Sequence, residues 1–330
     1  MKAAVIEPGP AGPLLLLREV DAPAAGPLDI TVNVRAAGLN RADLRRAASH
    51  FATSQGAVGP AIAGLEMAGD VVAVGAQVSG VAVGDRVMAM TGGSWAEQVA
   101  FDHRLAVPVP DRFDWHQAAA TPISFITAHD ALSRAARLVR GESVLIQGAT
   151  SSAGLAATQL AVAMGASQVF ATSTSPKKLA QLRERGGIPI DASSEDVAAR
   201  VQQETHGRGV DVVIDVVGQG AVQQNIDAAA VRGRIVCLGR LAGVNGTFNL
   251  DEFSRKQITM VGVTFRTRTS EERFEVVRRF GEEVVPLLST GAVRPVVDRS
   301  FPMTALQDAE DYMRASQGLG KILIDVAVGS

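Results

Sequence analysis

Cysteine and aromatic residues are scarce in this 330-residue sequence, and neither sign of charge dominates. The one cysteine, Cys237, excludes an intrachain disulfide framework and a structural zinc site built on several thiolates. Aromatic residues make up 4%, too few for base-stacking platforms, and 32 Lys and Arg stand against 34 Asp and Glu, which indicates no basic face. Nucleic acid is therefore not an expected partner.

Long apolar runs are also absent, so no stretch approaches the length of a membrane span. Residues 7–10, Glu-Pro-Gly-Pro, interrupt the apolar start of the chain and remove any secretory pattern. A content of 47% apolar and 20% charged residues is typical of a soluble globular protein, and the length allows about two domains. We expect a cytoplasmic protein that acts on a small molecule and has no membrane partner.

The first ~120 residues are rich in short β-like runs separated by Gly and Pro, as at 30–34, 69–75 and 85–90. This pattern predicts an antiparallel, barrel-like region, with helical signal only at 40–48. The tail returns to similar strands from residue 296 after a long amphipathic helix at 271–288. We therefore expect one domain, residues 1–120 and 266–330, interrupted by an inserted domain.

The inserted domain, residues 121–265, begins in an alanine-rich helical segment at 118–138 and then alternates strands with helices. Continuous apolar strands between helices predict a doubly wound parallel sheet, the α/β Rossmann architecture. The expected strands are 143–147, 168–172, 188–190, 210–216 and 234–238, and the expected helices are 153–164, 176–185, 194–205 and 221–230.

A turn of small residues joins the first of these strands to its helix, from Gly148 to Gly154. Small residues let backbone N–H groups approach a pyrophosphate, and the helix N-terminus favours an anion. The match to G-x-G-x-x-G is imperfect, because serine replaces the central glycine. The alternative interpretation is that small residues only let the helix pack against the sheet.

The next strand ends in Thr-Ser-Thr-Ser at 172–175, where an NAD enzyme usually presents an acid to the ribose 2′-hydroxyl. Hydroxyl groups followed by Lys177 and Lys178 suit a 2′-phosphate instead, which favours NADPH over NADH. The alternative is that Ser175 and Pro176 only begin a helix. The later strands end at Val217-Gly218 and Leu238-Gly239, which should line the nicotinamide side, with Arg240 near a phosphate.

Six motifs together resemble the medium-chain dehydrogenase/reductase superfamily, on its branch of zinc-independent quinone oxidoreductases. They lie at 37–44, 64–71, 83–87, 148–154, 209–218 and 320–324 and follow the family order along nearly the whole chain. The resemblance implies a GroES-like β-barrel domain beside the Rossmann domain. It also implies two candidate catalytic residues, Asn40 and Thr127, near the nicotinamide ribose and ring. The full cofactor-binding set that we expect is Asn40, Thr127, Thr150, Ser151, Ser152, Ala153, Ser173, Thr174, Lys178, Val217, Leu238, Gly239, Arg240, Val263 and Phe265.

The sequence departs from the zinc-dependent relatives, which carry a cysteine before Asp43 and a Gly-His-Glu triplet where this chain has Gly-Leu-Glu at 64–66. No metal site is expected, since His129 and Asp130 are adjacent on a predicted helix and point apart. Some relatives place a tyrosine near the 2′-phosphate where this chain has Ala192. The only tyrosine, Tyr312, is expected at the surface or in the core near the C-terminus.

These features predict hydride transfer from NADPH to a quinone or conjugated enone, with the Asn40 amide stabilising the developing oxyanion. One alternative is an enoyl-thioester reductase, for which Arg41, Arg45 and Arg46 could contact the acyl carrier. Another is a non-catalytic NADPH-binding protein. His50 could donate a proton, although a lone loop histidine is more often solvated. The apolar stretch 258–263 predicts a homodimer formed by pairing of sheet edges.

Overall fold

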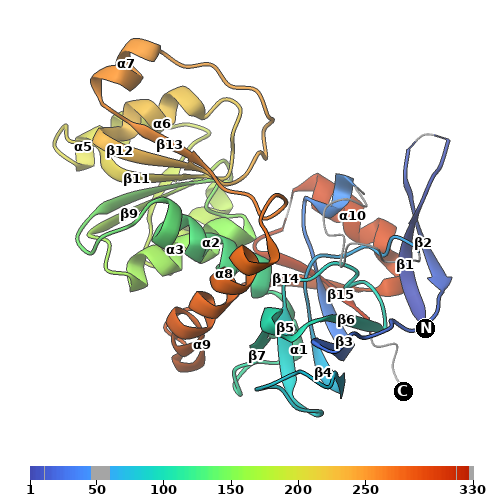
Figure 1. Cartoon of the computed structure of the whole chain (residues 1–330). Coiled ribbons are helices and arrows are strands. Elements are labelled where there is room, and N and C mark those ends of the chain that lie inside the picture. Colours follow the sequence, from blue (N-terminus) through green and yellow to red (C-terminus); the bar gives the residue numbers. More distant parts are fainter. Residues whose placement is uncertain (11, 46–59, 317, 327–330) are drawn as a thin grey trace. The chain divides into compact units, whose positions relative to one another are not determined.

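The computed structural model describes residues 1–10, 12–45, 60–316 and 318–326 (Figure 1). The chain divides into two compact units, the first formed by Met1–Ile123 with Arg266–Ser330 and the second by Ser124–Phe265. Within the described ranges, no helix is both long and apolar enough to cross a membrane.

Unit 1 is built on a seven-stranded sheet with the order β14-β15-β3-β4-β5-β7, and β6 also pairs with β3. Its longest strand, β3, alternates between the two faces, and its inward residues join the core around Trp95 and Met67. β1 and β2 pair separately as an antiparallel hairpin. The strands are β1 (Lys2–Glu7), β2 (Leu14–Glu19), β3 (Asp29–Leu39), β4 (Met67–Val74), β5 (Arg86–Ala89), β6 (Gln98–Asp102), β7 (Ala106–Pro108), β14 (Val297–Pro302) and β15 (Lys321–Asp325).

The C-terminal strands complete the sheet begun by the N-terminal segment. β15 runs antiparallel to β3, with Ile322 opposite Leu39. This register places Lys321, the first residue of β15, beside Asn40, which directly follows β3. Two segments about 280 residues apart in sequence therefore meet in one site. The helices of the unit are α1 (Trp115–Ala119), α8 (Ser270–Glu283), α9 (Val285–Thr290) and α10 (Leu306–Ala315), with short turns η1 (Asp43–Arg45), η3 (His103–Leu105) and η7 (Met303–Ala305).

Unit 2 is a six-stranded parallel sheet with the order β10-β9-β8-β11-β12-β13. Helices α2 and α3 cover one face and α5 and α6 the other (Figure 1), so the predicted doubly wound α/β fold is confirmed. The elements are α2 (Thr127–Asp130), β8 (Ser143–Gln147), α3 (Ser152–Ala163), β9 (Gln168–Ser173), η6 (Pro176–Lys178), α4 (Leu179–Arg183), β10 (Ile188–Asp191), α5 (Val197–Glu204), β11 (Val210–Asp215), α6 (Val222–Ala228), β12 (Ala229–Cys237), α7 (Leu250–Arg255) and β13 (Thr259–Gly262).

The direction of winding reverses beside β8, since β9 lies on one side of it and β11 on the other. In such sheets, ligands bind beyond the carboxyl ends of the strands at this switch point. The site positions that we predicted at the ends of β8, β9, β11 and β12 therefore all lie at one edge of the sheet.

Three local predictions need correction. The helix expected over 221–230 ends at Ala228, because Ala229 pairs with Val210 and begins β12, so strand pairing overrides the helix preference of alanine. The segment 118–138 is helical but interrupted by two π-helical stretches, η4 (Pro122–Ile126) and η5 (Ala131–Ala135). The helix expected over 40–48 reduces to the turn η1, with 46–48 outside the described residues.

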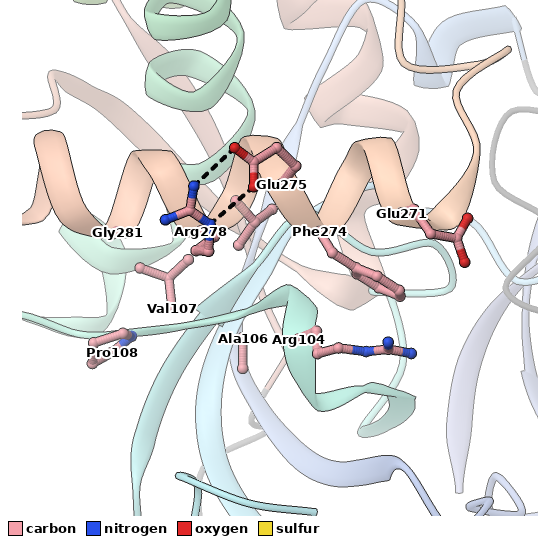
Figure 2. A pocket seen from close by; sticks show the side chains of 10 residues that line it. Arg104, Ala106, Val107, Pro108, Glu271, Phe274, Glu275, Arg278 and Gly281 are labelled. Carbon is pink, nitrogen blue, oxygen red and sulfur yellow. Dashed lines mark hydrogen bonds and ion pairs between the residues drawn. The ribbon is translucent and has the colours of Figure 1, made fainter.

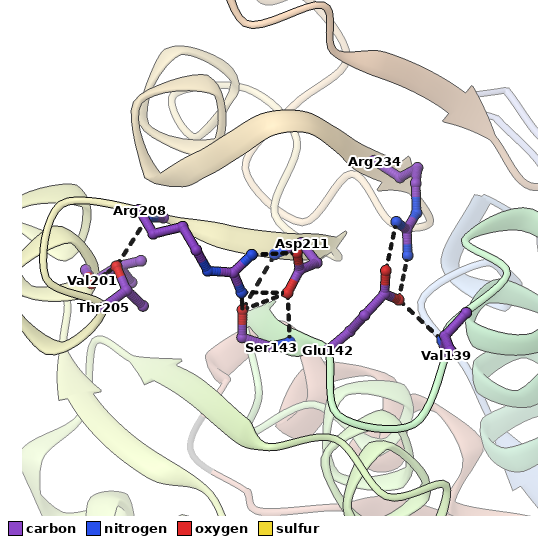
Figure 3. Close-up of polar contacts among 9 residues, drawn as sticks. Val139, Glu142, Ser143, Val201, Thr205, Arg208, Asp211 and Arg234 are labelled. Atoms are coloured by element: carbon purple, nitrogen blue, oxygen red, sulfur yellow. Dashed lines mark hydrogen bonds and ion pairs between the residues drawn. The ribbon is translucent and has the colours of Figure 1, made fainter.

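The amino ends of the strands carry a separate polar network (Figure 3). Arg208 donates two hydrogen bonds of 2.6 Å to Asp211, which also accepts one from the Ser143 hydroxyl, and Glu142 pairs with Arg234. Partial burial opposes ionisation of Asp211, but these donors outweigh it and lower its pKa to about 2. Because ligands bind at the opposite strand ends, these contacts stabilise the sheet and take no part in the candidate site.

Candidate cofactor and hydride-transfer site

A pocket of about 470 Å³ in unit 1 lies between α8 and residues 104–108 (Figure 2). The Arg104 guanidinium stacks on the Phe274 ring at 3.9 Å, and Arg278 pairs with Glu275 at 2.8 Å. Both arginines that line it are therefore already engaged, and none of the predicted site residues lines it. The predicted site residues lie elsewhere, in two clusters that belong to separate units.

The turn before α3 is held in shape by its own side chain and glycines. The Ser151 hydroxyl accepts a hydrogen bond from the Gly154 N–H at 3.1 Å and donates to the Gly148 carbonyl at 2.9 Å. Gly148 has φ +71°, and a Cβ at Gly154 would lie 2.5 Å from the Gly148 carbonyl oxygen. Glycine is required at both positions because a side chain would strain or block the turn.

This turn leaves backbone donors at the start of a 12-residue helix. The N–H groups of Ser152 and Ala153 belong to the first turn of α3, where no intrahelical acceptor exists, and both residues are half-buried. A pyrophosphate placed there would meet these donors and the positive end of the helix dipole. The residues fit a dinucleotide, with Thr150 and Ser152 as the available hydroxyls, because the Ser151 hydroxyl is engaged within the turn.

The end of β9 separates the predicted 2′-phosphate residues into two groups. Ser173 is buried, and its hydroxyl accepts from the Ser175 N–H at 3.0 Å and donates to the Ser175 carbonyl. Thr174 and Lys177 are exposed, and Lys178 is half-buried. Thr174 and Lys177 thus present exposed hydroxyl and ammonium groups after the strand, whereas the Ser173 hydroxyl is engaged within the loop.

The turns after β11 and β12 lie together at the same sheet edge. Gly218 has φ +79° and forms a bridge with Gly243, so the chain after β12 folds beside the turn after β11. Val217 and Leu238 are half-buried beside this bridge, while Arg240 is exposed. The Val263 N–H donates to the Cys237 carbonyl at 3.1 Å, which places Val263 next to the end of β12. Phe265 is also buried, and Thr127 begins α2 in a half-buried position.

A side-chain network lies beneath these turns and was not predicted. The Asp215 carboxylate accepts from the N–H groups of Val217 and Gly218 at 2.8 and 3.0 Å and from the Asn225 amide at 3.0 Å. Burial raises the pKa of Asp215, and these three donors oppose the increase. Asn225 in turn accepts from Gln147, which accepts from Thr172.

In unit 1, Asn40 belongs to a buried ionic cluster. Lys321 Nζ donates to Asn40 Oδ1 at 2.6 Å and pairs with Glu66 Oε1, while Asn40 Nδ2 donates to the same Glu66 oxygen at 2.9 Å. The second Glu66 oxygen accepts from the Ile123 N–H at 2.7 Å. The side chains of Lys321 and Glu66 are 1% and 0% exposed, so the charges compensate each other away from water.

The backbone of Asn40 is held in place as well, by hydrogen bonds with Asp43. The Asn40 N–H donates to Asp43 Oδ2 at 2.7 Å, and the Asp43 N–H donates back to the Asn40 carbonyl at 2.9 Å. Loss of hydration raises the pKa of Asp43 to about 7, against the opposing effects of the Asn40 N–H and Lys321. Gly38 leaves the space that Glu66 fills, since a Cβ there would overlap its carboxylate.

Glu66 and Lys321 lie in motifs that the sequence singled out, but no role was predicted for either. The available signal was a lysine at the start of a buried apolar strand, which must find a counter-charge. Of the other candidates, His50 and Arg46 lie outside the described residues, and Tyr312 packs against Phe301 in a half-buried position on α10. In the part of the chain that the structure describes, no three His, Cys, Asp or Glu side chains gather as metal ligands.

Two family models match the chain. The alcohol dehydrogenase GroES-like domain matches residues 26–111, and the zinc-binding dehydrogenase domain matches residues 153–284. Quinone oxidoreductase from Pseudomonas aeruginosa is 31% identical over 321 residues, covering 95% of this chain and 96% of that protein. Squalestatin tetraketide synthase from Phoma sp. is 34% identical over 303 residues, covering 89% of this chain but only 11% of that protein.

Solved structures that align along nearly the whole chain include the same two kinds of protein, a quinone oxidoreductase and an enoyl reductase. A quinone oxidoreductase from Pseudomonas syringae superposes with a TM-score of 0.84 at 27% identity, covering 98% of this chain and 100% of the other. The CurK enoyl reductase superposes with a TM-score of 0.82 at 25% identity, covering 98% of each chain. The chain thus matches whole quinone oxidoreductases, but it spans about a tenth of the polyketide synthases that it also matches.

Proposed function

Because the chain belongs to the medium-chain dehydrogenase/reductase superfamily, in its quinone oxidoreductase-like branch, we propose that it reduces a quinone or a conjugated enone with NADPH and without a catalytic metal. It is an oxidoreductase of a family that binds a nicotinamide cofactor. The finer proposal concerns the choice of cofactor, the acceptor and the absence of a metal.

The choice of NADPH follows from the groups after β9. None of residues 174–178, where an acid would bind the ribose 2′-hydroxyl of NADH, carries a carboxylate. Exposed Thr174 and Lys177, with half-buried Lys178, supply hydroxyl and ammonium donors for a 2′-phosphate. Ala192, whose N–H donates to the Ser173 carbonyl, adds no side-chain donor there.

The arrangement of the Asn40 amide is the single observation that carries the proposal. Lys321 occupies its oxygen, and Glu66 takes one of its two N–H bonds. The second N–H has no partner among the described residues, and it is held in place by a buried charge pair. NADPH, when bound, would supply a hydride, which is a proton with two electrons, to the acceptor, whose oxygen then gains negative charge. A preorganised amide donor stabilises that charge, and solvent can deliver the final proton.

The donor set also favours chemistry without zinc. Leu65 stands where the zinc-dependent relatives carry histidine, and it is buried and has no ligand atom. Glu66 is saturated by Lys321, Asn40 and Ile123, which leaves its carboxylate poorly placed to bind a cation. An acceptor already activated by conjugation needs no Lewis acid, whereas simple alcohol oxidation does.

A steady-state screen tests this proposal. NADPH and NADH consumption would be measured with simple quinones and enones for the wild type, Asn40→Ala and the control Asn33→Ala. Asn33 lies on β3, the strand that Asn40 follows, and its amide oxygen accepts from Gln98. We expect Asn40→Ala to lower kcat about 10²-fold and the control to retain wild-type activity. Absence of turnover with both acceptor classes, despite NADPH binding, would refute the proposal.

An enoyl thioester is the second candidate acceptor, favoured by the similarity to CurK enoyl reductase and to polyketide synthases. The hydride step and the Asn40 role would be unchanged, since a thioester enolate also carries negative charge on oxygen. Competition between a crotonyl thioester and a quinone, measured as the ratio of kcat/KM values, discriminates between the two. A protein that binds NADPH but turns over none of these acceptors would instead have a non-catalytic role.

A further inference from the structure

We propose that four buried side chains, Thr172, Gln147, Asn225 and Asp215, position the two cofactor-facing turns of unit 2 as one coupled element. We call them the carboxyl-edge chain. They extend from the turn after β8 to the turn after β11, across the ends of the strands. The inference requires only that a nicotinamide dinucleotide binds at this edge, so it stands apart from the proposed acceptor and from Asn40.

The links of the carboxyl-edge chain are continuous. The Gly148 N–H donates to the Thr172 hydroxyl at 3.0 Å, and that hydroxyl donates to Gln147 Oε1 at 2.9 Å. Gln147 Nε2 donates to Asn225 Oδ1 at 3.0 Å, and Asn225 Nδ2 donates to Asp215 Oδ2 at 3.0 Å. The other Asp215 oxygen accepts from the N–H groups of the turn at Val217 and Gly218.

The two ends fix the direction of every bond between them. A backbone N–H such as that of Gly148 can only donate, and an ionised carboxylate can only accept. Asn225 Nδ2 must therefore face the carboxylate, so Asn225 Oδ1 accepts from Gln147 Nε2. Gln147 Oε1 is then left to accept from the Thr172 hydroxyl, and each amide adopts only one of its two orientations. Bonds aligned in one direction polarise one another, so breaking one link weakens the rest.

Burial makes this arrangement sensitive to single substitutions. Thr172, Gln147, Asn225 and Asp215 are at most 3% exposed, so water cannot replace a lost partner without rearrangement. Removal of the Thr172 hydroxyl would leave the Gly148 N–H unsatisfied at the start of the pyrophosphate turn. That turn would shift, because an unpaired buried donor costs more than a small movement of the backbone.

Paired variants of Thr172 test the proposal. Thr172→Val removes the hydroxyl with little change of shape, and Thr172→Ser restores it. Thr158→Val is the control, since the buried Thr158 hydroxyl only donates to the Gly154 carbonyl within α3. Dissociation constants for NADPH and for NADH would be measured by nicotinamide fluorescence, alongside melting of the unliganded protein. We expect Thr172→Val to weaken the tighter dinucleotide about tenfold, and Thr172→Ser and the control to stay within about twofold.

Asn225→Ser independently tests the part of the carboxyl-edge chain that is nearer the turn after β11, because the Asn225 side chain donates to neither turn directly. Gln224→Ala is its control, since Gln224 accepts from the same Gln147 amide but leads to no turn. We expect Asn225→Ser to weaken dinucleotide binding and Gln224→Ala to leave it unchanged. The double variant Thr172→Val/Asn225→Ser should bind no more weakly than whichever of its two single variants binds more weakly. Lower melting temperatures with unchanged dissociation constants in Thr172→Val or Asn225→Ser would overturn the proposal, and either folded variant suffices for that decision.

Discussion

Lys321→Met is the perturbation whose energetic effect follows most directly from the structure. The variant keeps the apolar stem in the core and removes the ammonium group, so Glu66 becomes an uncompensated charge in a fully buried position. Breaking a buried ion pair by removing one partner costs about 3–5 kcal/mol. Glu66 retains the Asn40 and Ile123 donors, so we expect the lower end, about 3 kcal/mol of the free energy of unfolding.

Calorimetry and urea unfolding measure this effect. A loss of about 3 kcal/mol corresponds to a fall in melting temperature of roughly 10 °C for a domain of this size. Arg278→Met is the control in the same unit, since its pairs with Glu275 and Glu282 are more than half exposed and should contribute much less to stability than the buried pair.

The double variant Lys321→Met/Glu66→Gln separates charge from packing. With both charges removed, the amide oxygen can still accept from Ile123 or Asn40, so the double variant should be more stable than Lys321→Met alone. The reasoning is refuted if Lys321→Met unfolds within about 0.5 kcal/mol of the wild type. It is equally refuted if the double variant is less stable than the single one.

The remaining predictions concern pH, cofactor choice and assembly. Burial raises the pKa of Asp43 to about 7, so its contribution to stability is present at low pH and is lost as pH rises toward 7. Asp43→Asn should therefore gain in melting temperature relative to the wild type as pH rises through that window. Parallel curves of melting temperature against pH for the two proteins would contradict this. Thr174→Asp should weaken NADPH binding at least about tenfold without weakening NADH binding, and equal losses would argue against the 2′-phosphate assignment. β13 is an edge strand of its sheet, so light scattering should give a dimer, and a monomer would contradict edge pairing.

Much of the fold was predictable because local patterns and tertiary structure agree. The expected strand over 143–147 coincides with β8, and the helix expected from 153 begins one residue earlier at Ser152. Buried parallel strands are continuously apolar, and the glycines of the turns are required by their backbone, so both leave clear marks in the sequence. The prediction weakened at Ala229, where pairing with a distant strand decided the conformation.

The buried polar residues of the site were less predictable. Asn40 and the turn at 148–154 carry signals in their own neighbourhood, but Lys321 meets Asn40 only through the pairing of β15 with β3. Gln147, Thr172 and Asn225 likewise come from two strands and a helix, and each looks unremarkable in its own segment. Long-range hydrogen bonds of this kind depend on strand order, which periodicity does not determine.

The central claim is hydride transfer from NADPH to a conjugated acceptor, and isotope transfer tests it most directly. NADPH deuterated at both C4 positions of the nicotinamide would be incubated with an enone, and the product analysed by mass spectrometry and NMR. The account predicts one deuterium on the β-carbon of the product, formed about 10²-fold more slowly by Asn40→Ala. Unlabelled product, or no reduction of any enone or quinone while NADPH binds, would contradict it.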